Sequence, residues 1–282
     1  MIWGATGVTG MNSAVLLLVP GVGYVVASGW YLVRLGRGTT GPSRMLSAIV
    51  YASVAIHVAL LALRMAGAPA AAFSGVLESA VLVSLVMVVA CLIAARYWRG
   101  DAPAALVLLV AGAGLIVVSR LLPENQAAAP DVLRSAWLWV HVPLTLAAFI
   151  LYALAGSGAA MYLLVGSFLK SPPSMKVLRN LPTLDSLERF SHRMAEIGFP
   201  LLTAGLFTGM VWAHAVWGHS LSGTPKQMTA VATWLVYAGY FHARFAQGMR
   251  GRRCAWILVV GCVVALVGYV LGAMGVDAHS FV

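Results

Sequence analysis

Long apolar runs follow one another along the chain and constrain its fold more than any other feature of the sequence. Runs of roughly 18–25 mostly apolar residues are long enough to cross the hydrocarbon core of a membrane as α-helices. A soluble domain would need far more than the 9% of charged residues found among these 282. We predict an all-α, polytopic integral membrane protein of about eight transmembrane helices. The predicted spans lie near 14–35, 45–65, 75–95, 103–122, 137–168, 196–216, 228–245 and 254–275.

The distribution of lysine and arginine predicts which ends of these helices face the cytoplasm. Of the 18 basic residues, 14 fall in one set of alternate loops and 4 in the other. Cytoplasmic loops are enriched in basic residues, so we assign the richer set to the cytoplasm and both termini to the outer side. The longest loop, 169–195, is then cytoplasmic, and its LPTLDSLERFSHRM stretch is expected to form a short amphipathic surface helix. His192 in that loop is expected to be solvated.

The whole chain, 1–282, is predicted to form a single membrane domain. Cys91, Cys254 and Cys262 lie in or beside apolar runs without a C-x-x-C spacing. A disulfide framework, a zinc site and a covalent haem-attachment box are therefore not expected. The first apolar run is interpreted as a retained helix because no basic residue precedes it. The net charge of +10 arises from short loops between spans and does not indicate nucleic-acid binding.

Seven histidines are the leading candidates for chemistry in a chain with few other ionisable groups. Polar groups inside a membrane are expensive and often functional, and neutral imidazole is a common ligand of haem iron. The predicted topology brings His141, near the start of the fifth span, and His279, in the C-terminal tail, to the same outer face. His242 lies near the inner end of the seventh span, and His57 within the second. A hydrogen bond between helices is the alternative role for any one of them.

Tryptophans accompany the outer histidines. Trp137, Trp139, Trp212 and Trp217 all lie near the predicted outer boundary. Such residues form the aromatic belt of many membrane proteins. A haem site also requires flat aromatic and apolar surfaces around its iron ligands. Composition alone does not separate these two roles.

Six blocks occur in an order that is typical of a known family. They are HVALLALRMAGAP at 57–69, FSGVLES at 73–79, WVHVPLTLAAFILY at 139–152, GFPLLTAGLFTGMVWAHAVWG at 198–218, WLVYAGYFHAR at 234–244 and GYVLGAMGVDAHS at 268–280. From about residue 50 to the C-terminus, the chain resembles the CcsA/ResC branch of the cytochrome c assembly proteins. That superfamily also includes CcmC-type and HemX-like proteins. The block at 198–218 is the most specific, and the predicted sidedness agrees with the family.

The resemblance implies a membrane protein of cytochrome c biogenesis that binds haem, expected as haem b, and holds or relays it at the outer face. In that family an outward histidine pair ligates the iron beside a tryptophan-rich loop. The matching positions here are His141 and His279, with Trp212 and Trp217 beside them. The iron would therefore be bound by these two histidines.

The resemblance also assigns the inner histidines and the partners. His242 matches a histidine of an intramembrane haem site or route, and His57 matches a recurrent histidine of the early block. A ResB-like membrane protein and an apocytochrome c are the implied partners, besides haem and the lipid bilayer. The chain would be the haem-presenting part of a cytochrome c synthase only together with such a partner, because catalysis by this chain alone is not expected. The expected location is a bacterial cytoplasmic membrane, with a plastid membrane as the alternative.

The outer loop departs from the family pattern. The motif W-G-x-x-W-x-W-D-P-K-E aligns without a gap to WGHSLSGTPKQ at 217–227. Leu221, Gly223, Thr224 and Gln227 stand where the family has two tryptophans and two acids. A HemX-like or otherwise specialised member fits this loop. Two further hypotheses are a haem-free structural or regulatory membrane subunit derived from the family, and a transporter that uses the same histidines.

Overall fold

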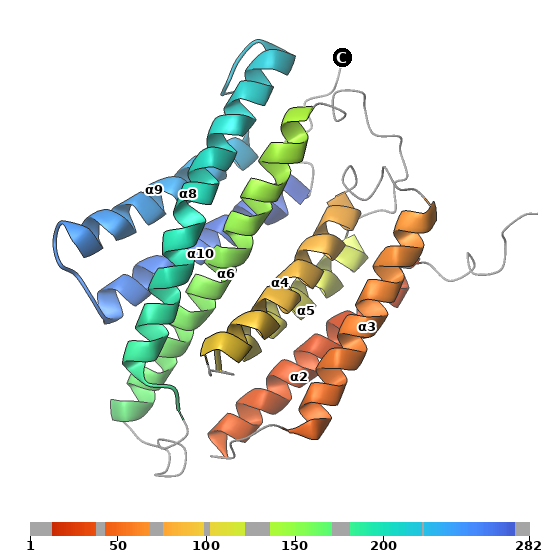
Figure 1. Ribbon diagram of the computed structural model, residues 1–282, viewed down its shortest axis with the longest axis vertical. Helices are drawn as coiled ribbons and strands as arrows, with labels where there is room; N and C mark the ends of the chain where they lie inside the picture. The colour runs from red at the N-terminus through yellow and green to blue at the C-terminus, as the bar shows by residue number, and fades with distance from the viewer. Residues whose placement is uncertain are drawn as a thin grey trace, which may run out of the picture.

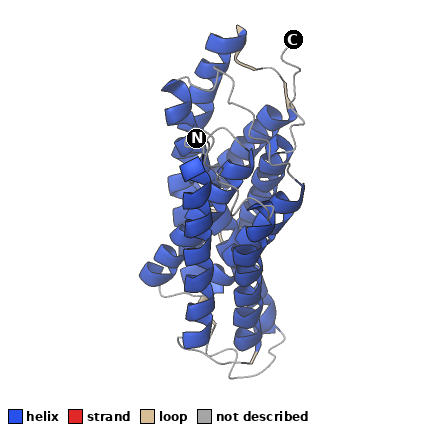
Figure 2. Cartoon of the chain, turned by 90° about the vertical axis from the view of Figure 1, so that its right-hand side faces the viewer, coloured by secondary structure: helices blue, strands red, loops and turns tan. Residues whose placement is uncertain are grey.

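The computed structural model describes residues 13–37, 43–67, 76–98, 102–121, 136–170, 181–221 and 223–273. Within these ranges every regular element is an α-helix, and eight of the helices have 19 residues or more (Figure 2). The helices are α1 (Ser13–Leu16), α2 (Leu18–Gly36), α3 (Arg44–Gly67), α4 (Val76–Trp98), α5 (Ala102–Leu121), α6 (Ala136–Lys170), α8 (Leu184–Trp217), α9 (Pro225–Phe245) and α10 (Arg252–Ala273). Each long helix corresponds to one predicted span, which confirms the all-α architecture.

Several helices have the length and composition that a membrane requires. In the described part of the chain, four stretches are long and apolar enough to cross it: Arg44–Leu63, Val140–Lys170, Leu184–Ala215 and Arg252–Leu271. Shorter apolar stretches lie at Val81–Ile93 and Leu106–Val117. Large apolar side chains on these helices are exposed, as expected where lipid is the solvent. The protein is therefore a polytopic membrane protein, and the count of eight spans with both termini outside stays a prediction.

The helices form two neighbouring groups (Figure 1). In the first group, α2 packs against α3 and α5, and α4 packs against α5. In the second, α6 packs along α8 and against α10, and α10 packs against α9. Contacts of α6 with α4 and α5 join the groups. The helix α6 is thus the central element of the fold, and most of its side chains between 152 and 159 are buried.

The helix α8 begins earlier than the sequence pattern predicts. The predicted span starts near 196, whereas α8 begins at Leu184 and runs without interruption to Trp217. Thr183 caps it by accepting a hydrogen bond from the backbone N–H of Ser186 at 3.2 Å. The expected short surface helix is therefore the first part of α8. Its apolar face is buried, which ties it to the bundle: Leu187, Phe190 and Met194.

A 34-residue helix is about 51 Å long, which exceeds the roughly 30 Å of the hydrocarbon core. At the tilts of roughly 0–40° that membrane helices adopt, part of α8 must therefore extend beyond the hydrocarbon core. The charged side chains of its first turns, including Asp185, Arg189 and Arg193, are exposed. We infer that the charged first third of α8 occupies the interface and the water beyond it.

A pair of tyrosines fills the centre of the second helix group. The rings of Tyr152 on α6 and Tyr237 on α9 stack with centroids 3.6 Å apart and an interplanar angle of 13°. Each ring lies in a notch at a glycine: a Cβ on Gly198 would lie 2.9 Å from Tyr152 Cε1, and one on Gly261 2.7 Å from Tyr237 Cε2. Both rings are fully buried, so the glycines of α8 and α10 allow four helices to pack around them.

The hydroxyl groups of this pair lead to a first prediction. Among the described residues, neither the Tyr152 nor the Tyr237 hydroxyl has a hydrogen-bond partner, whereas the buried Tyr24 hydroxyl contacts His57 Nδ1 at 3.2 Å. We expect Tyr152→Phe to leave the free energy of unfolding unchanged or to raise it by up to about 1 kcal/mol. Tyr24→Phe, the matched control, should lower it by about 1–2 kcal/mol. Detergent-to-SDS unfolding measures both values, and an equal loss in the two variants would contradict the prediction.

Candidate functional site

The candidate site is built around His141, near the N-terminal end of α6. Its ring is half-buried, and Nδ1 lies 2.7 Å from the backbone carbonyl oxygen of Gly205 on α8. A carbonyl can only accept, so Nδ1 must carry the proton that makes this hydrogen bond. In a neutral ring, the lone pair of Nε2 is then left for another ligand. The contact joins residues 64 positions apart in the chain and fixes the ring's orientation.

Two glycines of α8 make room for this ring. A Cβ on Gly209 would lie 2.6 Å from His141 Cε1, and a Cβ on Gly205 would lie 2.6 Å from Cγ2 of Thr145. The Thr145 hydroxyl donates back to the His141 carbonyl at 2.9 Å, which keeps its methyl group toward α8. Gly205 and Gly209 have G-x-x-x-G spacing and form a close helix-packing face. This face brings His141 against the backbone of α8.

Further side chains on α8 and α9 surround the imidazole. Trp212 follows Gly205 and Gly209 on the same face of α8 and is half-buried, with its indole nitrogen inside the protein. Lys226, in the first turn of α9, lies close enough to His141 for its positive charge to act on the imidazole. Between the two helices, Gly218 ends α8 in the left-handed conformation, with φ of 74°. The site therefore combines an imidazole, an indole and an ammonium group.

The other residues of the expected outer site are only partly described. His279 lies outside the described residues, so the structure gives no distance between His279 and His141. Trp217 is the last residue of α8, and its side chain lies outside the described part. His214 and His219 lie beside this helix end, and both are exposed. The pairing of His141 with His279 stays a prediction.

His57 occupies a different environment, between helices α2, α3 and α4. Its ring is fully buried, Nε2 lies 3.1 Å from the carbonyl oxygen of Val81, and Nδ1 lies 3.2 Å from the hydroxyl of Tyr24. Since the carbonyl can only accept, Nε2 donates to Val81 and Nδ1 accepts from Tyr24. Both ring nitrogens thus bond within the protein and connect three helices. Sequence pattern alone did not reveal these two partners.

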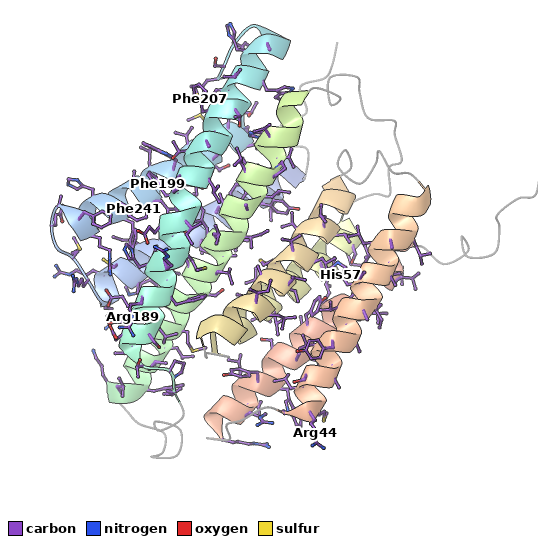
Figure 3. All side chains as sticks on the ribbon, viewed as in Figure 1. Arg44, His57, Arg189, Phe199, Phe207 and Phe241 are labelled. Atoms are coloured by element: carbon purple, nitrogen blue, oxygen red, sulfur yellow. The ribbon has the colours of Figure 1, made fainter. Side chains whose placement is uncertain are left out.

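The structure does not bring His57 and His242 together. His57 lies in the first helix group (Figure 3), whereas His242 lies in the last turn of α9 in the second group. The helices α3 and α9 lie on opposite sides of the bundle, with α6 and α8 between them (Figure 1). The His242 side chain is exposed. An inner haem position could therefore use only one of these two histidines.

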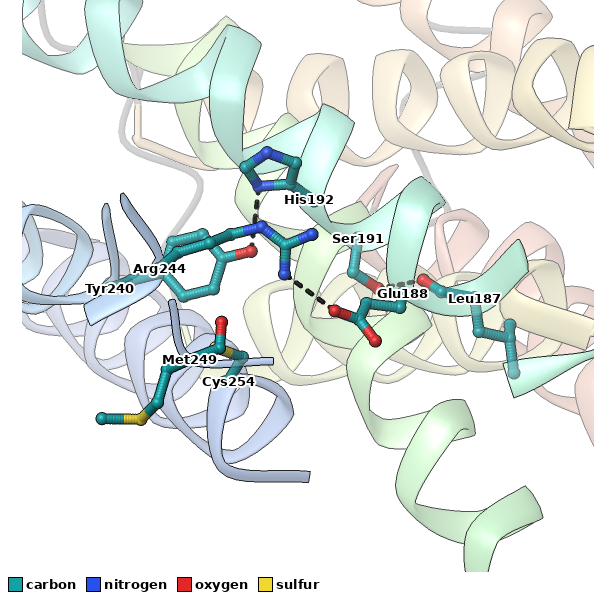
Figure 4. A network of polar contacts seen from close by, with 8 residues as sticks. All are labelled: Leu187, Glu188, Ser191, His192, Tyr240, Arg244, Met249 and Cys254. Atoms are coloured by element: carbon teal, nitrogen blue, oxygen red, sulfur yellow. Dashed lines mark hydrogen bonds and ion pairs between the residues drawn. The ribbon is translucent and has the colours of Figure 1, made fainter. Parts of the chain in front are cut away.

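A polar network joins α8 to the end of α9 and was not foreseen (Figure 4). Arg244 donates to the Glu188 carboxylate at 2.8 Å. His192 Nδ1 lies 3.0 Å from the Tyr240 hydroxyl, so the expectation that His192 is solvated is wrong. These pairs are 56 and 48 positions apart in the chain. The only sequence signal was that both helix ends were predicted on the cytoplasmic side.

One further sulfur contact belongs to this network. The Cys254 thiol donates to the Met249 carbonyl oxygen at 3.2 Å, which holds the start of α10 against the α9–α10 turn. In the described part of the chain, no three His, Cys, Asp or Glu side chains gather into a group that could hold a bare metal ion. Haem iron needs fewer protein ligands than a bare metal ion, because the porphyrin supplies most of its ligands and the chain only the axial ones.

Comparison with known proteins identifies the family. The family model described as Cytochrome C assembly protein matches residues 44–276. The curated relatives of this chain include proteins named Cytochrome c biogenesis protein CcsA from several organisms. That of Prochlorococcus marinus (strain MIT 9303) is 34% identical over 193 residues, 58% of this chain and 60% of the relative. That of Synechococcus sp. (strain RCC307) is 37% identical over 188 residues, with the same two shares, and that of Guillardia theta is 33% identical over 179 residues, 57% and 60%.

The chain spans about 60% of the length of the curated relatives that it matches. The family match nevertheless begins at the start of α3 and continues past the end of α10, so it includes all but the first long helix of the described structure. Both His57 and His141 lie inside the matched region. The match and the relatives together show that this chain belongs to the cytochrome c assembly protein family, in its CcsA-type branch.

Proposed function

We propose that this protein binds haem b at the outer membrane face, with His141 and His279 as axial ligands, and holds or relays it during cytochrome c biogenesis. The observation that carries the proposal is the bond between His141 Nδ1 and the Gly205 carbonyl at 2.7 Å. Histidines that ligate metals commonly donate the other ring N–H to a backbone carbonyl or carboxylate. That bond leaves Nε2 with the lone pair that iron requires.

Lys226 supports the same proposal through its charge. Haem carries two propionates, and the ammonium group of Lys226 is a cation of the kind that pairs with a carboxylate. Trp212, on the same face of α8 as Gly205 and Gly209, offers an aromatic surface beside the porphyrin. These two residues would orient the haem, while the histidines hold its iron.

The roles of the inner histidines follow from their surroundings. We propose that His57 holds α2, α3 and α4 together, because both of its ring nitrogens bond within the protein. The exposed His242 is the better candidate for an inner haem position. The partners proposed are a ResB-like membrane protein and an apocytochrome c, since the relatives are named for cytochrome c biogenesis. The proposed location is a bacterial cytoplasmic membrane, with eight spans and both termini outside.

An absorption spectrum of the detergent-purified protein, oxidised and reduced, tests the site. The wild type is expected to show a bis-histidine haem spectrum that the His141→Ala/His279→Ala variant loses. The matched control is His214→Ala/His219→Ala, which removes two exposed histidines from the same end of α8 and should keep the haem. Haem that persists in the first variant would move the site towards His242. A wild type without haem, even when it is expressed with haem precursor, would leave the proposal without support.

One observation favours a second candidate, a haem-free structural or regulatory subunit. Gly223 stands where the family motif has a tryptophan, and its φ is 69°. A tryptophan is strained in this left-handed conformation, so the loop as it is shaped here favours glycine at this position. Thr224, in contrast, keeps the helix-capping role that an aspartate would have: its side chain accepts from the Gln227 N–H at 3.4 Å. The helix start is retained while the platform is lost.

A further inference from the structure

Three arginines at the start of α10 have no acidic partner among the described residues. Arg250, Arg252 and Arg253 lie within four positions of one another, and all three are exposed. Other arginines at this end of the molecule are neutralised: Arg193 pairs with Glu196 at 2.9 Å, and Arg189 pairs with Asp185. The start of α10 therefore carries a concentrated positive charge that no acidic side chain in the described part of the chain compensates.

The position of these arginines relative to the membrane follows from α10. Its apolar stretch, Arg252–Leu271, has 20 residues and is about 30 Å long, which matches the hydrocarbon core. Arg252 and Arg253 begin this stretch, so their side chains lie at the level of the lipid headgroups. The short turn before them includes two glycines with positive φ, Gly248 and Gly251, which keeps the arginines close to the helix end. The count of basic residues predicts the cytoplasmic leaflet, which is rich in anionic lipids.

A continuous apolar stripe runs from the arginines along the exposed face of α10. It consists of Trp256, Val260, Val263, Val267 and Val270, which are 45–53% exposed. Their spacing of four, three, four and three residues places them on one helix face. Trp256 lies about one turn inside the boundary, where tryptophan is favoured at the interface. The valines beyond it form a smooth, β-branched surface without polar groups.

We propose that this surface binds an acidic phospholipid. The headgroup phosphate would lie against Arg252 and Arg253, with Arg250 beside it, and one acyl chain would lie along the stripe from Trp256 to Val270. Guanidinium groups bind phosphate oxygens through paired N–H donors, which a row of adjacent arginines suits better than a single charge. The positively charged helix end adjoins an apolar stripe that runs into the membrane. This combination favours a lipid over a soluble anion as the ligand. The binding does not depend on haem.

Lipid titration of the purified full-length protein tests this proposal. Native mass spectrometry measures the affinity for phosphatidylglycerol and, separately, for phosphatidylcholine. The wild type should prefer phosphatidylglycerol, and Arg252→Gln/Arg253→Gln should bind it roughly 30-fold more weakly, with phosphatidylcholine unchanged. The control Arg189→Gln/Arg193→Gln removes the same charge from arginines that already have acidic partners, and it should retain the wild-type affinity.

Several results would overturn the proposal. Equal losses in the two variants would show a general charge effect, and an unchanged affinity in the first variant would exclude the site. Stabilisation by inorganic phosphate alone, equal to that by phosphatidylglycerol, would indicate a free-anion site. A dimer that dissociates in the first variant would indicate a second copy of the chain. If the glutamine variant does not fold, Arg252→Lys/Arg253→Lys keeps the charge without the paired donors and should still bind phosphatidylglycerol more weakly than the wild type.

Discussion

Replacing Gly209 with alanine is expected to weaken haem binding at least tenfold, if the His141 site is the one that binds haem. The added methyl carbon would lie 2.6 Å from His141 Cε1 and 2.9 Å from its Nδ1. The imidazole must then swing away from α8 and lose its bond to the Gly205 carbonyl. That bond sets both the tautomer and the direction of Nε2, so the iron ligand is displaced although its side chain is unchanged. A haem titration followed by absorption measures the effect.

The control for this variant is Gly239→Ala on α9, where an added Cβ meets nothing within 4 Å. Alanine is favoured over glycine inside a helix by roughly 1 kcal/mol, so the control should bind haem normally and unfold no more easily than the wild type. Unchanged haem affinity in Gly209→Ala would show that the orientation of His141 does not determine binding. A Gly209→Ala variant that loses haem but keeps its melting temperature would support a direct role of Gly209 in orienting His141.

Removing the Arg244 side chain is expected to lower the free energy of unfolding by about 3 kcal/mol. The Arg244 and Glu188 side chains are 14% and 23% exposed, and their charged atoms lie 2.8 Å apart. Arg244→Ala leaves the Glu188 carboxylate in a partly buried position without its partner, and this unpaired charge is the main source of the loss. The pair also connects α8 to α9, so the C-terminal end of α9 should loosen. Detergent-to-SDS unfolding measures the change.

A double-mutant cycle separates the ion pair from other effects. If Glu188→Ala and Arg244→Ala together cost less than the sum of the single variants, the difference is the interaction energy of the pair. The comparison pair is Arg189 with Asp185 on the same helix, whose side chains are 67% and 73% exposed. That pair should contribute about 0.3–0.5 kcal/mol, as exposed helix pairs do. Equal coupling energies for the two pairs would contradict the role assigned to burial.

The helices themselves were predictable because their signals are local. The predicted span 45–65 is α3 at Arg44–Gly67, and the span 254–275 is α10 at Arg252–Ala273. An apolar run of membrane length needs no tertiary partner to become a helix, since lipid leaves the backbone no other arrangement. The early start of α8 was missed because its first turns are charged on one face. Only contact with the rest of the bundle explains the burial of Leu187 and Phe190.

The candidate site was predictable in its residue types but not in its geometry. The sequence by itself determined which residues were candidates for binding a metal, namely the histidines, most of them near the ends of apolar spans. Only the tertiary structure decided how each imidazole is used. His57 has both nitrogens bonded to neighbouring helices, whereas His141 has one bonded to Gly205. The physical reason is distance along the chain: each hydrogen-bond partner belongs to another helix, and no local pattern records which helices meet.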